Sequence, residues 1–269
     1  MLEAKEVNFA YNRGEPVLHD ISCTIAKGES VALLGHNGSG KTTLSRLFMA
    51  LNHPRSGEIL VDDVNIEKFE PADLADKIGY VFQNPDLQIL EDTVFKEVAY
   101  GLANKKLSVD NINKKVEEAL EAMGLTELRD LYPRTLSFGQ KRRLGVAAAL
   151  ALSPDILILD EITNGQDQQE KEMMMEYLQK LNVEKQITII LITHDMEIAR
   201  EFTQRSLVLN NGDLVYDGKT SELFDGVKDL TGWGLFQPPL AKLGATFGLK
   251  VLKTTDFCDN LVLKGGKDQ

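Results

Sequence analysis

The chain has 269 residues, 43% of them hydrophobic, which is enough for one large α/β domain with a core and a small appendage. Its 41 acidic residues outnumber its 30 Lys and Arg, and the formal charge of −11 argues against nucleic acid as a partner, because that binding relies on clustered Lys and Arg. Cys23 and Cys258 form no spaced framework, so we expect reduced thiols in a cytosolic protein. We find no leader segment and no apolar run of membrane-spanning length, so we expect neither secretion nor membrane insertion.

Residues 1 to about 30 predict strands around a turn at 12–16, and an apolar strand at 30–34 follows. This strand leads into a glycine-rich loop that opens a helical pattern: Gly35, His36, Asn37, Gly38, Ser39, Gly40, Lys41, Thr42 and Thr43. Glycines let backbone N–H groups surround an anion, and the first turn of a helix adds unpaired donors and a positive dipole end. We expect Lys41 to reach the β- and γ-phosphates and Thr42 to bind Mg²⁺. A plain glycine-rich turn is the alternative, but the Lys-Thr pair at this spacing favours a nucleoside triphosphate site.

From about 84 to 135 the pattern becomes helical. An amphipathic helix is predicted at 93–103, and a second one at 113–123 ends at Gly124, a suitable C-cap. The segment Leu136-Ser137-Phe138-Gly139-Gln140 then precedes a run of good helix formers at 141–152. Ser137 is the natural N-cap of that helix, and a serine-capped helix N-terminus is also an anion site.

Two later apolar segments predict buried parallel strands that end in polar side chains. The strand at 156–160 ends in Asp160, with Glu161 beside it, and the strand at 187–193 is followed by His194. Ligands of α/β sheets collect at the carboxyl ends of the strands, so these three side chains are candidates for a site. The alternatives are a solvated strand end for the acidic pair and a structural role for the histidine.

The order of these motifs resembles that of ABC-type ATPases, with a phosphate loop, a signature motif at 136–140 and a Walker B strand at 156–161. The resemblance implies that Ser137, Phe138, Gly139 and Gln140 cover the γ-phosphate of ATP held by a facing cassette, so one chain holds half of each active centre. It further implies one role for each of several residues: Asp160 holds Mg²⁺, Glu161 polarises the attacking water, His194 contacts the γ-phosphate, Gln83 touches Mg²⁺ and water and senses the membrane partner, and Tyr11 stacks on adenine. Phe9 and Tyr11 are alternatively core residues of an N-terminal strand.

Two positions depart from the commonest family pattern. Ile162 follows Glu161 where proline is usual, and Phe138 replaces a more frequent glycine. Neither change removes a phosphate or metal ligand. In the family, the following D-loop, which includes Asp167, crosses the dimer seam, and the two changes leave the geometry of this loop undetermined.

The implied fold is α/β: a phosphate-loop ABC cassette with a RecA-like mixed sheet, an N-terminal antiparallel β edge and a helical subdomain. We expect the cassette at 1–225, its helical subdomain at about 84–152, and a hairpin around 210–213. Residues 226–269 form a C-terminal extension, in which the run 235–243 predicts a helix with proline near its first turn, and Trp233 and Phe236 add apolar weight. The extension is either a tail packed on the core or a self-association element, and the resemblance favours dimerisation.

Within the ABC class, the segments 81–88, 91–101 and 136–143 and the tail look like the ATPase subunits of energy-coupling factor (ECF) transporters, which include cobalt and nickel importers. The resemblance implies a second ATPase subunit, alike or different, a transmembrane coupling protein and a small membrane substrate-binding protein. It also implies a place at the cytoplasmic face of the cell membrane and uptake of a vitamin or a transition-metal ion. We expect Val94, Phe95, Val98 and Tyr100 to offer a wall for a helix of the membrane subunit, or else to pack the helical segment onto the core.

Other classes remain to be weighed. A conventional ABC importer or exporter ATPase is the main alternative, and a signalling ATPase without a membrane partner is a more distant one. DNA-repair relatives split the cassette with long coiled coils, whereas only about 50 residues separate Gln83 from the signature here, without sustained heptads. Ribosome-associated relatives carry two cassettes in one chain.

Overall fold

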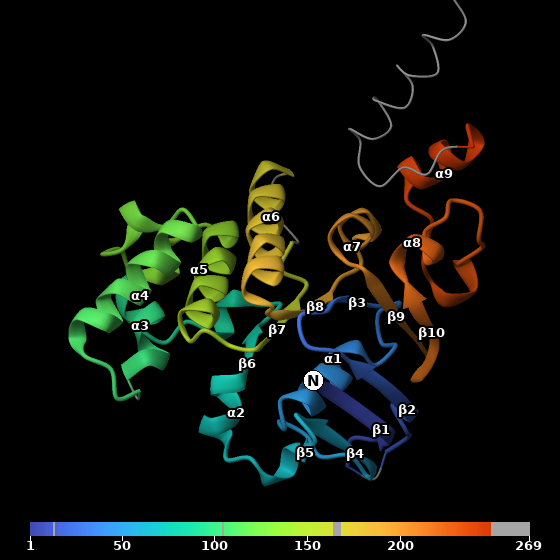
Figure 1. Cartoon of the computed structure of the whole chain (residues 1–269), viewed down its shortest axis with the longest axis horizontal. Coiled ribbons are helices and arrows are strands. Elements are labelled where there is room, and N and C mark those ends of the chain that lie inside the picture. Colours follow the sequence, from blue (N-terminus) through green and yellow to red (C-terminus); the bar gives the residue numbers. More distant parts are fainter. Residues whose placement is uncertain (13, 104, 164–167, 249–269) are drawn as a thin grey trace, which may run out of the picture.

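The computed structural model describes residues 1–12, 14–103, 105–163 and 168–248 (Figure 1). The expectations for Asp167 and Cys258 lie outside these residues. The described strands are β1 (Leu2–Phe9), β2 (Leu18–Ile25), β3 (Ser30–Leu34), β4 (Ser56–Val61), β5 (Val64–Asn65), β6 (Ile78–Val81), β7 (Ile156–Asp160), β8 (Thr188–Ile192), β9 (Arg205–Asn210) and β10 (Asp213–Lys219). The described helices are α1 (Lys41–Phe48), α2 (Pro71–Lys77), α3 (Val94–Ala103), α4 (Val109–Ala122), α5 (Phe138–Ala151), α6 (Gln168–Lys185), α7 (Met196–Phe202), α8 (Thr220–Leu223) and α9 (Pro239–Thr246).

Two sheets form the core. An antiparallel sheet has the order β2-β1-β4-β5, and a second sheet has the order β10-β9-β3-β8-β7-β6, in which all neighbours are parallel except the antiparallel pair β9 and β10. The α/β class, the N-terminal antiparallel edge and the hairpin at 210–213 are therefore as expected from the sequence. The parallel strands end at one edge of their sheet, where ligands of such sheets bind.

The central strands of the larger sheet are buried along their whole length. Every residue of β3, β7 and β8 is buried, which explains why their sequences are continuous apolar runs rather than alternating ones. Cys23, on the neighbouring antiparallel sheet, is also buried, and this burial raises the pKa of its thiol to about 12. At neutral pH this cysteine is therefore an unreactive core residue.

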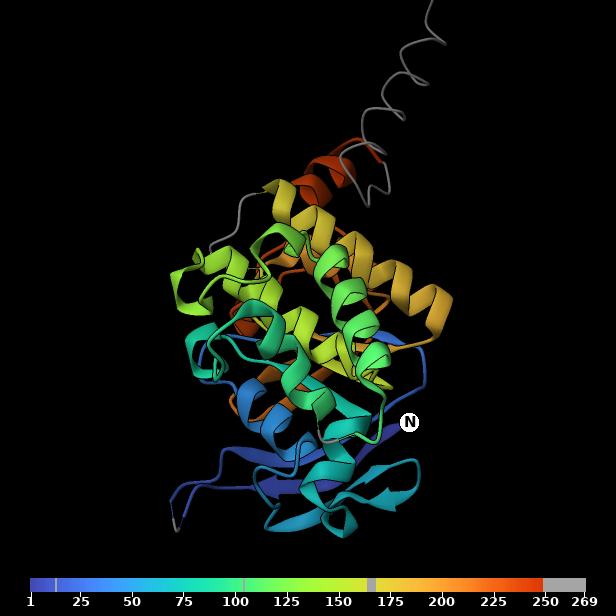
Figure 2. The same ribbon diagram turned by 90° about the vertical axis from the view of Figure 1, so that its left-hand side faces the viewer.

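The helical subdomain consists of α3, α4 and α5, which stand beside the β7–β6 end of the sheet (Figures 1 and 2). The second of the expected helices, α4, begins earlier than its periodicity indicated, because Ser108 caps it by accepting a hydrogen bond from the Asn111 N–H at 3.3 Å. Gly124 follows the helix with a φ of +63°, as expected for a C-terminal stop. The expectation of a docking wall is wrong for Val94 and Val98, because both are fully buried in the core of the subdomain.

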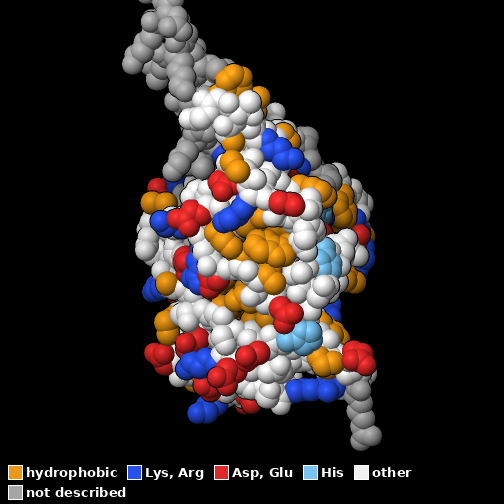
Figure 3. All heavy atoms as spheres, turned by 90° about the vertical axis from the view of Figure 1, so that its right-hand side faces the viewer, with side chains coloured by type: hydrophobic (Ala, Val, Ile, Leu, Met, Phe, Trp, Pro, Cys, Tyr) orange, Lys and Arg blue, Asp and Glu red, His pale blue; other side chains and the backbone are white. Residues whose placement is uncertain are grey.

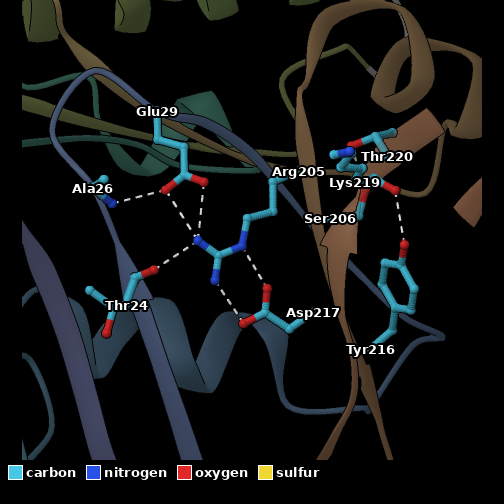
Figure 4. A network of polar contacts seen from close by, with 9 residues as sticks. All are labelled: Thr24, Ala26, Glu29, Arg205, Ser206, Tyr216, Asp217, Lys219 and Thr220. Carbon is cyan, nitrogen blue, oxygen red and sulfur yellow. Dashed lines mark hydrogen bonds and ion pairs between the residues drawn. The ribbon is translucent and has the colours of Figure 1, made fainter. Parts of the chain in front are cut away.

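An arginine links the two sheets (Figure 4). Arg205, at the start of β9, donates to both carboxylate oxygens of Asp217 on β10, at 2.6 and 2.7 Å, and to Glu29 at 3.1 Å. The same guanidinium donates to the backbone oxygen of Thr24 on β2 at 2.9 Å. Planar, bidentate contacts of this kind fix orientation, so the network holds the antiparallel sheet in place against the sheet that carries the phosphate loop.

The first part of the C-terminal extension packs on the core. Leu230 and Leu235 are buried in a cluster with Ala32, Leu34 and Val208 of the larger sheet. The rings of Tyr216 and Trp233 lie 6.2 Å apart beside this cluster. Hydrophobic side chains also gather on the face of the molecule shown in Figure 3. The packing of 230–235 matches the alternative of a tail on the core, whereas the boundary at 225 and the dimerising role of the extension stay predictions.

Candidate functional site

The phosphate loop connects β3 to α1 in the predicted way. Gly35 has a φ of +144°, and a Cβ added there would lie 2.2 Å from the Leu209 carbonyl oxygen, so only glycine fits. Gly40 is the N-cap of α1 with a φ of +106°. These conformations wrap the backbone tightly in front of the helix, which leaves the helix N-terminus facing the space enclosed by the loop.

Lys41 lies inside this loop. Its Nζ donates to the carbonyl oxygens of Gly35 and His36 at 2.8 and 2.9 Å, and burial lowers the pKa of its ammonium group, although the carboxylates of Glu161 and Asp160 oppose this effect. The hydroxyl of Ser39 is buried without a hydrogen-bond partner. A buried cation and an unsatisfied buried hydroxyl are both stabilised by an anion with oxygen acceptors, and a phosphate group fits that description.

Asp160 ends β7 as predicted and is buried. The hydroxyl of Tyr80 on β6 donates to its Oδ2 at 2.9 Å, and Ser45 on α1 lies 3.2 Å from the same hydroxyl. Burial raises the pKa of Asp160, while the hydrogen bond from Tyr80 and the charge of Lys41 oppose the shift. A carboxylate that is costly to ionise gains most from a nearby cation.

Glu161, Gln83 and His194 meet at the carboxyl edge of the sheet. Gln83 Nε2 donates to Glu161 Oε2 at 2.6 Å, and His194 Nδ1 lies 3.5 Å from Glu161 Oε1. Glu161 has a φ of +50°, which is unusual for a residue other than glycine, and its N–H donates to the carbonyl of Ile192 on β8 at 2.8 Å. Backbone strain of this kind is typical of functional sites, because it aims a side chain that regular geometry would turn elsewhere.

Arg142 is a positioning residue to which the sequence did not assign a role. From α5 its guanidinium donates to the backbone oxygens of Glu161 at 2.5 Å and Gln83 at 3.3 Å, and it stacks 4.6 Å from the centre of the Phe138 ring. One buried cation therefore holds the backbone at two site residues and touches the signature segment. Arg142 follows the signature by two residues, but no local pattern indicates its role, because its partners lie in other parts of the chain.

The phosphate loop, Gln83, Glu161 and His194 border one cavity of about 830 Å³, whereas the buried Asp160 and Arg142 do not line it. Its lining comprises Tyr11, Val17, Gly35, His36, Asn37, Gly38, Gly40, Lys41, Thr42, Thr43, Gln83, Glu161, His194, Met196, Gly234, Leu235 and Phe236. Tyr11 is half exposed, and its hydroxyl lies 3.1 Å from the Thr43 Oγ1, so its ring stands at the edge of the phosphate loop. The three residues from the C-terminal extension were not expected from the sequence.

The signature segment lies apart from this cavity. Ser137 caps α5 by accepting a hydrogen bond from the Gln140 N–H at 3.2 Å, while the Gln140 side chain accepts one from the Ser137 N–H at 2.9 Å. Ser137 and Phe138 are exposed, Gly139 is buried, and none of the four signature residues Ser137–Gln140 borders the cavity. The helix N-terminus at Ser137 is thus available to a ligand outside its own chain.

No group of three or more His, Cys, Asp or Glu side chains in the described ranges is arranged to enclose a metal ion. The oxygens of Asp160 and Thr42 are the candidate metal ligands, and hard cations such as Mg²⁺ prefer oxygen and are often shared with phosphates. Within the same ranges, no helix has the length and apolar character needed to cross a membrane.

Comparison with known proteins defines the class. Residues 18–164 match the ABC transporter family, and the chain belongs to this family of ATPases, in which ATP is bound and its hydrolysis is coupled to transport. A solved dimeric structure of the cassette MJ0796, bound to ADP and phosphate, has a TM-score of 0.75 at 31% identity and covers 82% of this chain and 99% of that one.

Other relatives are more similar to the chain, and some of them have names that place them in a particular transporter complex. The chain is 40% identical over 230 residues to an energy-coupling factor transporter ATP-binding protein, EcfA2, of Clostridium perfringens, covering 84% of this chain and 81% of the relative. The structure of cbiO1 from the same organism, part of the ABC transporter complex cbiONQ, has a TM-score of 0.78 at 36% identity. The match covers 91% of this chain and 98% of the cbiO1 chain. An ABC transporter ATP-binding protein of Methanosarcina mazei is 44% identical over 230 residues, 86% of this chain, which spans only 39% of that relative.

Proposed function

We propose that the cavity at the carboxyl edge of the larger sheet holds Mg-ATP. Lys41 and the N–H groups of 35–43 bind the β- and γ-phosphates, and Tyr11 stacks on the adenine. The observation that supports this assignment most strongly is the convergence of a buried Lys41, an unpaired Ser39 hydroxyl and a backbone loop that only glycine permits. The buried ammonium group and the unsatisfied hydroxyl are costly without a partner anion, and a bound triphosphate compensates both, while the glycine loop lets its N–H groups approach the phosphates.

The side-chain oxygens of Asp160, of the exposed residue Thr42 and of Gln83 would hold Mg²⁺ beside the phosphates. The ion would neutralise the charge that develops on the phosphates during transfer. Glu161 accepts a proton from the attacking water and orients it, and His194 contacts the γ-phosphate from the neighbouring strand end. Two hydrogen bonds keep this base in position: one that Gln83 donates to its carboxylate and one that Arg142 donates to its backbone oxygen.

Each complete active centre joins two subunits. The exposed, serine-capped N-terminus of α5 is suited to the γ-phosphate, but it does not border the cavity of its own chain. A second ATPase subunit would therefore place its Ser137–Gln140 segment over the ATP held by the first. The dimeric cassette of 31% identity supports this arrangement. The C-terminal extension is the proposed additional dimerisation element.

We further propose that the dimer drives an ECF importer at the cytoplasmic face of the cell membrane, together with a transmembrane coupling protein and a small membrane protein that binds a vitamin or a transition-metal ion. The two Clostridium relatives support this choice. A conventional ABC transporter is the alternative, supported by a structural match to an Atm1-family ABC exporter with ATP bound, at 26% identity and a TM-score of 0.75.

Co-purification from host membranes separates these two functions. The chain, tagged and expressed in its own host, should retain a coupling protein and a small substrate-binding membrane protein. Recovery of a transmembrane subunit that forms the whole translocation path, without a small binding protein, would favour the conventional transporter. Full ATPase activity with no membrane protein recovered would favour a signalling ATPase.

The docking surface is expected near the exposed residues that follow Gln83. Leu87 is 72% exposed and Tyr100 on α3 is 50% exposed, unlike the buried Val94 and Val98. Leu87→Asp or Tyr100→Asp should weaken co-purification with the coupling protein and uncouple uptake from hydrolysis, because a charge replaces an apolar contact. The matched control is Leu51→Asp, which alters another exposed leucine of the cassette. Equal complex formation by all three variants and the wild type would place the docking surface elsewhere.

A further inference from the structure

The start of the C-terminal extension is held firmly beside the nucleotide cavity. Leu235 is buried, and its N–H donates to the Leu230 carbonyl at 3.2 Å. Gln237 is also buried: its Oε1 accepts from the Gly226 N–H at 3.0 Å, and its Nε2 donates to the Leu223 carbonyl at 2.9 Å. Because both neighbours of Phe236 are fixed, its backbone and the direction of its Cα–Cβ bond are fixed as well.

Gly234 brings this segment against the phosphate loop. Its φ is +67°, and a Cβ added there would lie 2.8 Å from the Cβ of His36. The ring of His36 is held in turn by contacts with the Asn37 carbonyl at 2.7 Å and the Asn211 side chain at 3.2 Å. The extension and the phosphate loop are therefore in close contact through a position that favours glycine both sterically and in its backbone.

Phe236 stands at the rim of the cavity. It is 65% exposed, although the residues on either side of it are buried. It borders the nucleotide cavity together with His194 and Met196, and the same three residues border an adjoining cavity. The exposed ring thus lies at the His194 end of the cavity, on a backbone that does not depend on it for packing.

We propose that residues 234–236 of the C-terminal extension form a wall of the ATP site of their own chain, and that Phe236 contacts the bound nucleotide at its His194 end. The inference rests on the nucleotide site proposed above and does not require the ECF assignment. An apolar ring at this rim excludes water from the phosphates, and lower water content strengthens the contacts that Lys41 and the loop N–H groups make with them. Part of the ring is also buried by the ligand, which adds to affinity.

The experiment measures nucleotide affinity with the contribution of a facing subunit removed. The full chain carrying Ser137→Arg, which blocks closure of the dimer, is titrated with Mg-ATPγS by calorimetry. In this background, Phe236→Ala should raise the Kd by about fivefold. Phe236→Tyr, which keeps the ring, should restore the affinity to within about twofold. Leu243→Ala is the matched control, because Leu243 is an exposed apolar residue of the same extension that does not border the cavity.

The outcomes separate this inference from the site on which it rests. A Kd of Phe236→Ala within twofold of its background, an equal loss of affinity in Leu243→Ala, or a failure of Phe236→Tyr to restore affinity would each overturn the role of Phe236. Lys41→Ala serves as the test of the site itself: if it still binds Mg-ATPγS as tightly as its background, the nucleotide site is wrongly placed. Melting temperatures close to that of the background exclude misfolding as the cause of a raised Kd.

Discussion

Glu161→Gln is expected to stop ATP hydrolysis while leaving ATP binding intact. The amide has nearly the same shape as the carboxylate and keeps the contact with Gln83, but it cannot accept a proton from water. Removal of a positioned general base typically costs about 10²-fold or more in rate, so kcat should fall at least that far. Because ATP still binds but is not cleaved, dimers with trapped ATP should accumulate.

Steady-state ATPase assays and size-exclusion chromatography with and without Mg-ATP check this expectation. Glu170→Gln is a useful control, because Glu170 is another carboxylate that accepts a hydrogen bond, from Arg143 at 2.8 Å, but it does not border the cavity. A turnover of Glu161→Gln within about threefold of the wild type would remove the role assigned to this carboxylate.

The composite active centre predicts that two inactive variants restore each other. Lys41→Ala removes the cation that binds the phosphates in its own chain, and Ser137→Arg places bulk at a helix N-terminus that must approach the ATP of the other chain. Each homodimer should be inactive. In a mixed dimer, the intact phosphate loop of one subunit faces the intact signature of the other, so one of the two sites is complete.

An equimolar mixture should therefore recover about a quarter of the wild-type rate, since random pairing makes half of the dimers mixed and each has one working site. The measurement is the ATPase rate of the two variants mixed and alone, at the same total concentration. If Ser137→Arg alone hydrolyses ATP at the normal rate, catalysis does not use the signature of a facing subunit.

Local sequence patterns predicted the parts of the site that local chemistry determines. The phosphate loop needs glycines at particular backbone angles, and the strands before Asp160 and His194 are apolar because both faces of the sheet are covered. The serine cap of α5 is also a local feature, and the structure contains it together with the reciprocal bond that the Ser137 N–H donates to the Gln140 side chain. The motifs that follow separate strands meet in the fold because parallel strands end at the same edge of the sheet.

Local sequence patterns could not predict the contacts between segments that are distant in the sequence. Arg142 reads as an exposed base in a run of charged residues, yet α5 packs so that its guanidinium reaches two loop carbonyls. The amphipathic pattern of α3 identifies an apolar face but not its neighbour, so it allows either a docking wall or packing onto the core for Val94 and Val98. In the structure α4 and α5 bury both residues, which is the second alternative. Likewise, nothing in the run around Phe236 indicates that the extension returns to the phosphate loop.

The most direct measurement of the composite site is nucleotide-dependent cross-linking between two subunits. The background for this experiment is Glu161→Gln combined with Cys23→Ala and Cys258→Ser, which removes the native thiols. Asn37→Cys then places one thiol on the exposed part of the phosphate loop, and Ser137→Cys places one on the signature. A short thiol-reactive cross-linker should yield a covalent dimer when Mg-ATP is present, and little without nucleotide or with added Lys41→Ala. A cross-link that forms equally well without ATP, or that ATP fails to produce, would contradict a site shared between facing subunits.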